Sequence, residues 1–373
     1  MEFDIFFSIC QTEVDGYLPD EATMFRNFFD QVQLADDLGF GTAWVAESHL
    51  STEVQKGNPG AVIPHFVGEI GLNTDILQLA HRIFARTKQI GVGSAILNIL
   101  CNGGPIAQAE RIKTFLALHG LDPNERRLLT IGFASGRFPF INIPYGIVPR
   151  DEFEKANWSA VKNKIFEEAT EIFLRLLKGE ILSSDMVTPR FIADSRGDTQ
   201  VAPRWVFPKV KIVPQESRMD LLRLSIGSHD PAVQAFANTI LPVGVFNLSI
   251  TPGDEIEKTN ERMKNQYQGE WERRLMPRTV LVFIADDPAQ AADEARNALS
   301  NYWRALEGTL DEEKVRRATN NALVGNAEQI LGQMRERFHP DDRLMLWFDF
   351  NNHDSKRVMK NMSDFMTKVV PNV

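Results

Sequence analysis

The feature of this sequence that most restricts its fold is a regular alternation of short apolar runs with helix-like segments. Eight runs are rich in β-branched and aromatic residues. They are nearly continuous rather than alternating with polar residues, which is typical of strands buried on both faces of a parallel sheet. These predicted strands are 3–9, 42–46, 89–97, 128–134, 222–226, 243–248, 279–285 and 344–350.

Helical patterns separate the runs. In 21–38 the apolar residues recur at three- and four-residue spacing, so they form one stripe along a helix. Asp20 is placed to cap its first turn, and Gly39 suits a left-handed residue at its end. The segment 165–178 has the same design and is followed by Gly179. Further helices are predicted at 74–86, 105–118, 231–240, 254–267, 287–305 and 326–337, with a last amphipathic stretch at 354–369.

Eight strand-then-helix units are the number that closes a barrel. We therefore predict an α/β fold, a single (β/α)8 TIM barrel domain over residues 1–373. The loops after strands 2 and 4 are expected to be extended, and an insertion precedes strand 5.

Two intervals are too long for simple connections: 135–160, and the insertion at 180–220. Loops of this length in a compact domain are often functional lids. Their aromatic content favours ordered lids, while decoration without contact to a substrate is the alternative. The aromatic residues are Phe138, Phe140, Tyr145, Phe191, Trp205 and Phe207.

Composition excludes several classes of protein. The net charge of −9 argues against a nucleic-acid surface, which needs clustered Lys and Arg. No stretch reaches the roughly 18 apolar residues of a membrane helix. The start, MEFDIFFSIC, lacks the basic region of a signal peptide, and Cys10 and Cys101 are the two cysteines, so we expect a cytoplasmic protein. A disulfide between them stays open, although each reads better as a small buried hydrophobe than as a nucleophile.

Candidate site residues follow the predicted strands, because functional groups of a barrel lie past the strand C-termini. After strand 2, Glu47 and His49 place a carboxylate close to an imidazole, which suits proton transfer. A structural pair is the alternative reading. Strand 3 contains Gly91, Gly93 and Ser94, but the third glycine of a dinucleotide fingerprint is missing. Small residues there instead let a flat ligand approach the backbone.

Strands 4 and 5 end in small and polar residues. Ser135 and Gly136 are followed by Arg137, which could accept a ligand's phosphate or ribityl chain, or could simply form a tight turn. The sequence 227–231, Gly-Ser-His-Asp-Pro, precedes a predicted helix. Free amides at a helix start and a serine hydroxyl make a phosphate site, whereas plain capping by Asp230 is equally compatible.

Other chemistries lack their motifs. There is no zinc helix, calcium loop, Gly-x-x-x-x-Gly-Lys phosphate loop or Gly-x-Ser-x-Gly elbow. The seven histidines are scattered along the chain, so we predict no metal site.

Several segments together resemble the luciferase-like monooxygenase family. The stretch 33–49, QLADDLGFGTAWVAESH, is similar to that family's signature, in which Trp-Val-Ala-Glu is followed by two histidines. Similar family segments occur in the same order along the chain at 86–93, 105–110, 166–169, 227–231 and 324–330.

The resemblance implies a barrel that binds reduced FMN, supplied by a partner flavin reductase, and oxygenates a small organic substrate with dioxygen. A sister branch uses a deazaflavin coenzyme for hydride transfer, and members are commonly homodimers. By this resemblance His49 and Glu47 are catalytic. The cofactor would contact Ser94, Ala95, Ile96, Ser135, Gly136, Gly227, Ser228 and His229, often with a cis peptide between positions 95 and 96.

The chain departs from the family pattern at three places. Ser48 stands where the first histidine is expected, so His49 must carry any acid–base role. Ser135 replaces an arginine that commonly holds the phosphate, and Arg137 or Lys162 are the candidate substitutes. The segment 51–73 is longer than usual and is expected to reshape the pocket mouth. These departures keep open a non-catalytic flavin-binding protein beside the monooxygenase and the deazaflavin enzyme.

Overall fold

The computed structural model describes residues 1–56, 65–136, 138–194, 197–306 and 321–373. They form two compact units. Unit 1 comprises Met1–Ala95, Val245–Asn265 and Trp271–Val373, and unit 2 comprises Ile96–Gly244 and Gln266–Glu270. The assignment of 1–373 to a single domain stays a prediction.

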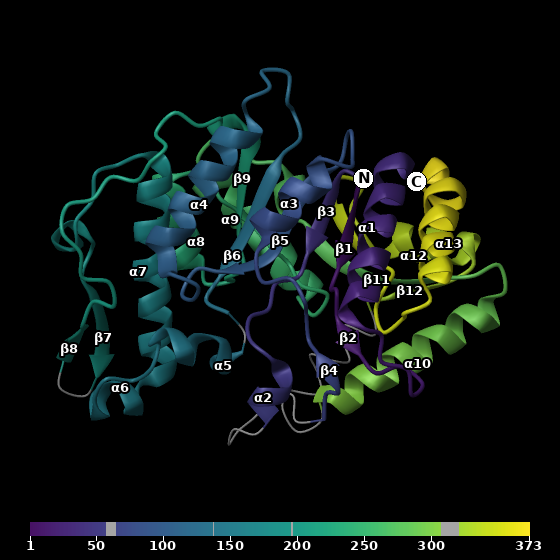
Figure 1. Cartoon of the computed structure of the whole chain (residues 1–373), viewed down its shortest axis with the longest axis horizontal. Coiled ribbons are helices and arrows are strands. Elements are labelled where there is room, and N and C mark those ends of the chain that lie inside the picture. The colour runs from purple at the N-terminus through teal and green to yellow at the C-terminus, as the bar shows by residue number, and fades with distance from the viewer. Residues whose placement is uncertain (57–64, 137, 195–196, 307–320) are drawn as a thin grey trace. The chain divides into compact units, whose positions relative to one another are not determined.

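Unit 1 is built on a parallel sheet in which β3 pairs with β5 and β1, β1 with β13, β13 with β11, and β11 with β12. Helices α1 and α13 pack side by side (Figure 1). The strands are β1 (Glu2–Phe7), β2 (Gln11–Thr12), β3 (Thr42–Val45), β4 (Gly68–Glu69), β5 (Gly91–Asn98, which continues into unit 2), β11 (Arg278–Ile284), β12 (Leu323–Gly325) and β13 (Arg343–Trp347). The helices are α1 (Glu21–Leu38), α2 (Thr52–Lys56), α3 (Ile76–Phe84), α9 (Gly253–Gln266), α10 (Pro288–Leu306), α12 (Ala327–Arg337) and α13 (Ser355–Asp364).

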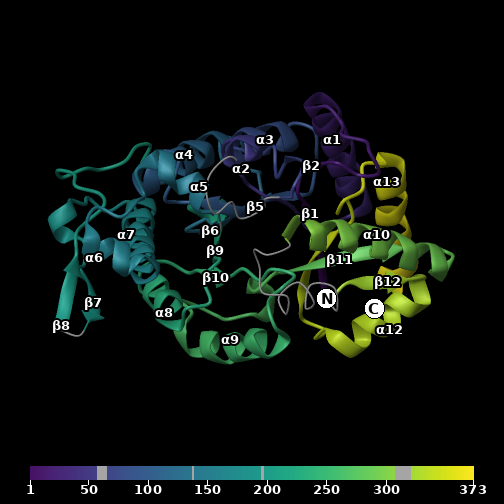
Figure 2. The same ribbon diagram turned by 90° about the horizontal axis from the view of Figure 1, so that it is seen from below.

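Unit 2 contains the parallel pair β6 (Leu129–Ala134) and β9 (Leu222–Ile226). The antiparallel hairpin of β7 (Arg190–Asp194) and β8 (Gly197–Val201) lies beside α6 and α7 (Figures 1 and 2). Its helices are α4 (Gly104–His119), α5 (Pro139–Asn142), α6 (Glu152–Ala156), α7 (Trp158–Lys178) and α8 (Pro231–Ile240).

The predicted elements agree closely with these bounds. The helix at 21–38 is confirmed together with its caps: Asp20 accepts a hydrogen bond from the Thr23 amide, and Gly39 has a φ of 84°. Helix α7 begins at Trp158, seven residues before its predicted start. The predicted strand 243–248 is reduced to β10 (Gly244–Val245), because Asn247 makes one isolated bridge to Arg278 before the chain turns into α9. The short strands β2, β4, β7, β8 and β12 were not predicted.

Two buried carboxylates join the elements of unit 1. Asp4 in β1 is fully buried and accepts hydrogen bonds from Trp44 Nε1 at 2.7 Å and from Arg343 Nε at 2.6 Å, which ties β1 to β3 and β13. Asp36 near the end of α1 accepts the backbone amides of residues 88–90 at 2.7 to 2.8 Å. Asp36, in the part of the family-like segment 33–49 that ends α1, thus positions the start of β5.

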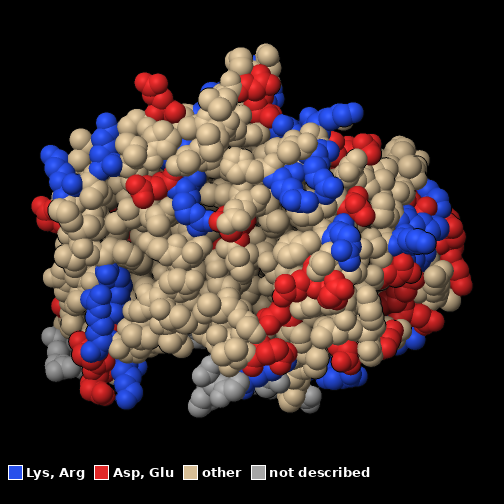
Figure 3. All heavy atoms as spheres, viewed as in Figure 1, with Lys and Arg blue, Asp and Glu red and all other residues tan. Residues whose placement is uncertain are grey.

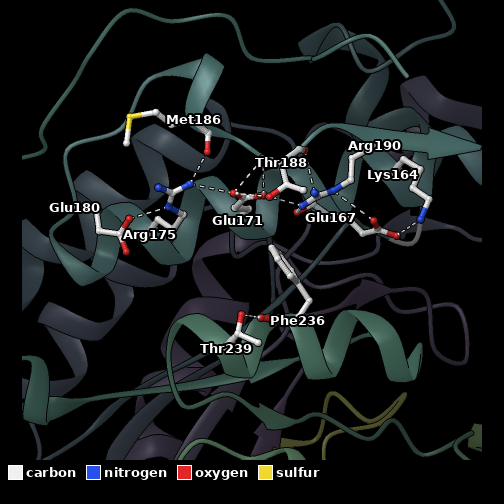
Figure 4. Close-up of polar contacts among 10 residues, drawn as sticks. All are labelled: Lys164, Glu167, Glu171, Arg175, Glu180, Met186, Thr188, Arg190, Phe236 and Thr239. Atoms are coloured by element: carbon white, nitrogen blue, oxygen red, sulfur yellow. Dashed lines mark hydrogen bonds and ion pairs between the residues drawn. The ribbon is translucent and has the colours of Figure 1, made fainter. Parts of the chain in front are cut away.

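Glu171 of α7 binds the first part of the insertion at 180–220. This carboxylate has a side chain only 4% exposed and accepts hydrogen bonds from Arg175 and Arg190 at 3.0 and 2.9 Å. It also accepts the amide of Thr188 (Figure 4). A lid function for the insertion stays a prediction, and the turn residues 195–196 lie outside the described part, as do 57–64 of the predicted pocket-mouth segment.

Charges on the surface are mixed in sign. Figure 3 shows Lys and Arg interspersed with Asp and Glu on the face drawn, without an extended basic area. No helix of the described ranges is long and apolar enough to cross a membrane.

We expect Glu171→Ala to lower the free energy of unfolding by about 3 kcal/mol, because two arginines lose their shared buried counter-charge. Urea denaturation would measure it. The control is Glu180→Gln, which alters a more exposed partner of Arg175 and should cost less than about 1 kcal/mol. Equal losses in the two variants would contradict a central role for Glu171.

Candidate active site

Glu47 and His49 follow β3 in unit 1 and form a buried pair. His49 Nε2 lies 3.0 Å from Glu47 Oε1, and the side chains are 5% and 1% exposed. The predicted proximity of the two groups is therefore confirmed. A carboxylate bound to one ring nitrogen orients the imidazole, and an oriented imidazole is what proton transfer requires. Their catalytic role remains a prediction.

The backbone around this pair is held by Asn73. The amide of Ser48 donates to the carbonyl of Asn73 at 2.9 Å, and Asn73 Nδ2 donates to the carbonyl of Ala46 at 3.0 Å. The Ser48 hydroxyl is buried and has no hydrogen-bond partner among the described residues. Ser48 thus offers a donor where the family pattern has a histidine.

Ser94 lies opposite Val45 in the pairing of β5 with β3. Its hydroxyl is fully buried and lacks a hydrogen-bond partner in the described part of the chain. The neighbouring Gly93 serves packing instead of ligand access: a Cβ there would lie 2.5 Å from the Trp44 ring. The expectation that glycine leaves room for a flat ligand is wrong for this residue, because the indole fills the space.

Sequence reasoning missed Asp349, two residues beyond β13. Burial raises the pKa of this carboxyl to about 7, and the Trp347 side chain and the backbone of Ser8 and Asp349 offset only part of the effect. Burial, and then the charge of Asp349, raise the pKa of the Cys10 thiol, so Cys10 is a protonated thiol rather than a nucleophile. The sequence does contain a sign of this buried acid, because Asp349 interrupts the apolar run 344–350.

In unit 2, the ends of β6 and β9 lie side by side. Phe133 pairs with Ile226, and the amide of Gly227 donates to the carbonyl of Phe133 at 2.9 Å. A Cβ on Gly227 would lie 2.7 Å from Ile96 Cδ1 and 3.2 Å from Ala134 Cβ. The predicted cofactor residues 135–136 and 227–229 therefore directly follow the C-terminal ends of two paired strands.

The turn after β6 is fixed by two asparagines. Asn98 Nδ2 donates to Asn142 Oδ1 at 2.7 Å, and Asn142 Nδ2 donates to the carbonyl of Ser135 at 2.9 Å. Gly136 has a φ of 74°, and a Cβ there would lie 2.3 Å from Asn98 Nδ2, so both conformation and space require glycine. Lys162 Nζ donates to the Gly136 carbonyl at 3.2 Å.

Lys162 is therefore the cation that the structure places at this turn, while Arg137 lies outside the described residues. Burial lowers the pKa of Lys162, as expected for an ammonium group with little solvent. After β9, Asp230 caps α8 by accepting the amide of Ala232 at 2.8 Å. Capping of this helix is thus observed, and phosphate binding by Ser228 and His229 stays a prediction.

The described residues show neither a metal-binding cluster nor a disulfide. No cluster of three or more His, Cys, Asp or Glu with metal-binding geometry occurs among the residues that the structure describes. Cys10 and Cys101 are both free thiols. The Ala95–Ile96 bond is trans, in contrast to the cis bond implied by the family resemblance; the cis peptide in the described ranges is Val213–Pro214.

The family model of the luciferase-like monooxygenases matches residues 1–343, so the chain belongs to this family. A sequence relative is the uncharacterized protein y4vJ of Sinorhizobium fredii, 24% identical over 210 residues, or 55% of this chain. The match spans about half the length of that relative (49%).

Solved structures show the fold. Monooxygenase RslO1 from Streptomyces bottropensis superposes with a TM-score of 0.72 at 17% identity, covering 100% of this chain and 99% of that one. The oxygenating constituent of 3,6-diketocamphane monooxygenase from Pseudomonas putida, in complex with FMN, gives 0.61 at 13% identity over 100% and 98%. An F420-dependent secondary alcohol dehydrogenase gives 0.56 at 13% identity over 99% and 98%. The predicted fold is confirmed as the luciferase-like α/β TIM barrel. Family membership supports a flavin-type cofactor and an oxidoreductase.

The raised pKa of Asp349 should make the stability of the protein depend on pH. Its folded pKa of about 7 lies above the ordinary value of 3.8, so the folded state binds more protons between these values. The contribution of Asp349 to stability is therefore most favourable below pH 4 and falls as the pH rises to about 7. We expect Asp349→Asn to gain stability relative to the wild type between pH 5 and pH 8, measured by urea denaturation. The exposed Asp341→Asn is the control, and an equal pH response of the two variants would refute the prediction.

Proposed function

We propose that this protein is a flavin-dependent monooxygenase that uses reduced FMN and dioxygen to oxidise a small, largely apolar organic substrate. The observation that carries the proposal is the match of the luciferase-like monooxygenase family over residues 1–343. Two of the three structural neighbours described above are named as monooxygenases, and one of these two contains FMN. Aromatic residues in 135–160 and 180–220 favour the apolar substrate.

The residues present fit a flat ring system with polar edges. The buried hydroxyls of Ser48 and Ser94 have no hydrogen-bond partner among the described residues, and such groups cost stability unless a ligand or water satisfies them. In unit 2, Lys162 supplies the positive charge that a phosphate group needs. The cofactor would be held by Ser94, Ala95, Ile96, Ser135, Gly136, Gly227, Ser228 and His229.

The bound cofactor would supply electrons and react with dioxygen, which is chemistry that side chains lack. His49 would hold or transfer the proton. Glu47 binds its Nε2, so Nδ1 is the ring nitrogen that would face the substrate. Because the pair is buried, water competes poorly for that proton. Glu47 is thus a positioning residue and His49 the acid–base group.

A deazaflavin-dependent dehydrogenase is the second candidate. It is favoured by the F420-dependent alcohol dehydrogenase among the structural neighbours. Ser48, in place of the family's histidine, suits an enzyme without oxygen chemistry and also a non-catalytic flavin-binding protein. For the monooxygenase we further propose a partner reductase that supplies reduced FMN, and a homodimer.

Titration with FMN, riboflavin and F420, followed by visible absorbance, tests the cofactor. We expect FMN to bind, and Lys162→Met to weaken FMN at least about tenfold without changing riboflavin affinity, because riboflavin lacks the phosphate. Lys164→Met is the matched control, since Lys164 belongs to the same helix but pairs with Glu167. If neither flavin nor F420 binds at tens of micromolar, the proposal fails, and binding of F420 alone selects the dehydrogenase.

We expect His49→Ala to lower kcat about 100-fold with the FMN dissociation constant unchanged, since general acid–base catalysis typically contributes that much. The assay uses reduced FMN, dioxygen and a panel of small ketones and alkanes. Glu47→Gln should displace the pH profile of kcat, and the exposed His339→Ala should have no effect. Full activity of His49→Ala would remove its catalytic role.

A further inference from the structure

Unit 2 contains a pocket that none of the candidate cofactor residues lines. Its volume is about 260 Å³. The walls come from the first turn of α4, the segment 145–150 and the insertion residues Arg204 and Trp205. The apolar side chains of Leu100 and Ile147 cover part of the wall.

Helix α4 begins at this pocket without a side-chain cap. Its N-cap is Gly103, with a φ of 93°, and no acidic residue occupies the first turn. By contrast α1, α3 and α8 are each capped by an aspartate. A Cβ on Gly104 would lie 2.6 Å from Trp205 Nε1, so the indole N–H reaches the helix start. Uncapped amides and the positive end of the helix dipole favour an anion.

The Arg204 guanidinium also points to a bound anion. Its side chain is 2% exposed, and Nη2 donates to Glu154 at 2.5 Å. Its Nε and Nη1 atoms are buried and have no hydrogen-bond partner among the described residues, although the residue lines the pocket. Buried guanidinium donors without acceptors are costly, so they indicate an acceptor that the protein itself does not supply.

The acidic groups nearby are already engaged. Glu154 accepts from Arg204 and from the amide of Arg150. Glu168 accepts the amides of Arg204 and Trp205 at 3.0 and 3.2 Å. These bonds fix residues 204–205 against α6 and α7, so the pocket wall is built in advance of any ligand. Arg150 adds a second positive charge to the lining.

We propose that this pocket binds a small oxyanion, the carboxylate or phosphate group of a metabolite, between the first turn of α4 and the Arg204 guanidinium. The group would accept from Arg204 Nε and Nη1 and from the helix amides. Leu100 and Ile147 would contact a short carbon chain attached to it. The proposal is independent of the cofactor assignment.

The test titrates the full chain at pH 7 with inorganic phosphate in one arm and butyrate in the other, followed by the Arg Nε–H resonances in NMR. Saturable displacement of the Arg204 resonance by either anion is the expected result, and the arm that binds more tightly identifies the source of the oxyanion. No saturable displacement by either anion up to tens of millimolar overturns the proposal.

Two variants test whether Arg204 and Trp205 bind the anion. Arg204→Met combined with Glu154→Gln removes the guanidinium without leaving a buried charge, and calorimetry should show anion binding at least about tenfold weaker. Trp205→Phe should weaken binding by a smaller factor while keeping the fold. The surface control Arg223→Met also removes one guanidinium group, outside the pocket, and should have no effect; equal weakening in this control would contradict a specific site.

FMN titration of the double variant separates this pocket from the cofactor site. Unchanged FMN affinity is expected. A parallel loss of FMN and phosphate affinity would overturn the assignment of a separate pocket, because the cofactor's own phosphate would then be the occupant.

Discussion

The carboxylate of Asp4 lies at the start of β1 without exposure to solvent and accepts hydrogen bonds from Trp44 and Arg343. It therefore joins three parallel strands, β1, β3 and β13, in one alignment. Parallel strands that are aligned at one end also present their C-terminal ends together. Glu47, His49 and Asp349 all follow such ends, so their placement in unit 1 depends on this alignment.

Buried carboxylates with several donors recur wherever a loop must be held. Asp36 accepts three backbone amides ahead of β5, Glu168 accepts two from the insertion, and Glu171 binds Arg190 of the insertion and Arg175 of its own helix. A carboxylate has room for about four hydrogen bonds, so one side chain satisfies several backbone groups that burial would otherwise leave unpaired. Arg204 is the contrasting case, since part of its bonding capacity remains unused inside a pocket.

Much of the fold was predictable because periodicity is a local property. The ranges of α1, α8 and β9 follow from spacing and caps such as Asp20, Gly39 and Asp230. The hairpin of β7 and β8 was not predictable, since its strands carry polar residues and β7 depends on packing against α7. The start of α7 was also missed, because the residues before 165 are largely polar and form a helix without a continuous apolar stripe.

The sequence by itself determined the strand and helix pattern, the family resemblance and the pairing of Glu47 with His49, because these depend on residues that are close along the chain. Only the tertiary structure decided that Lys162 lies beside Gly136, that Trp44 fills the space at Gly93, and that burial raises the pKa of Asp349. It also brought Arg204 to the start of α4, 100 residues earlier in the chain. Desolvation and close packing are set by residues distant in sequence, so no local pattern could have revealed them.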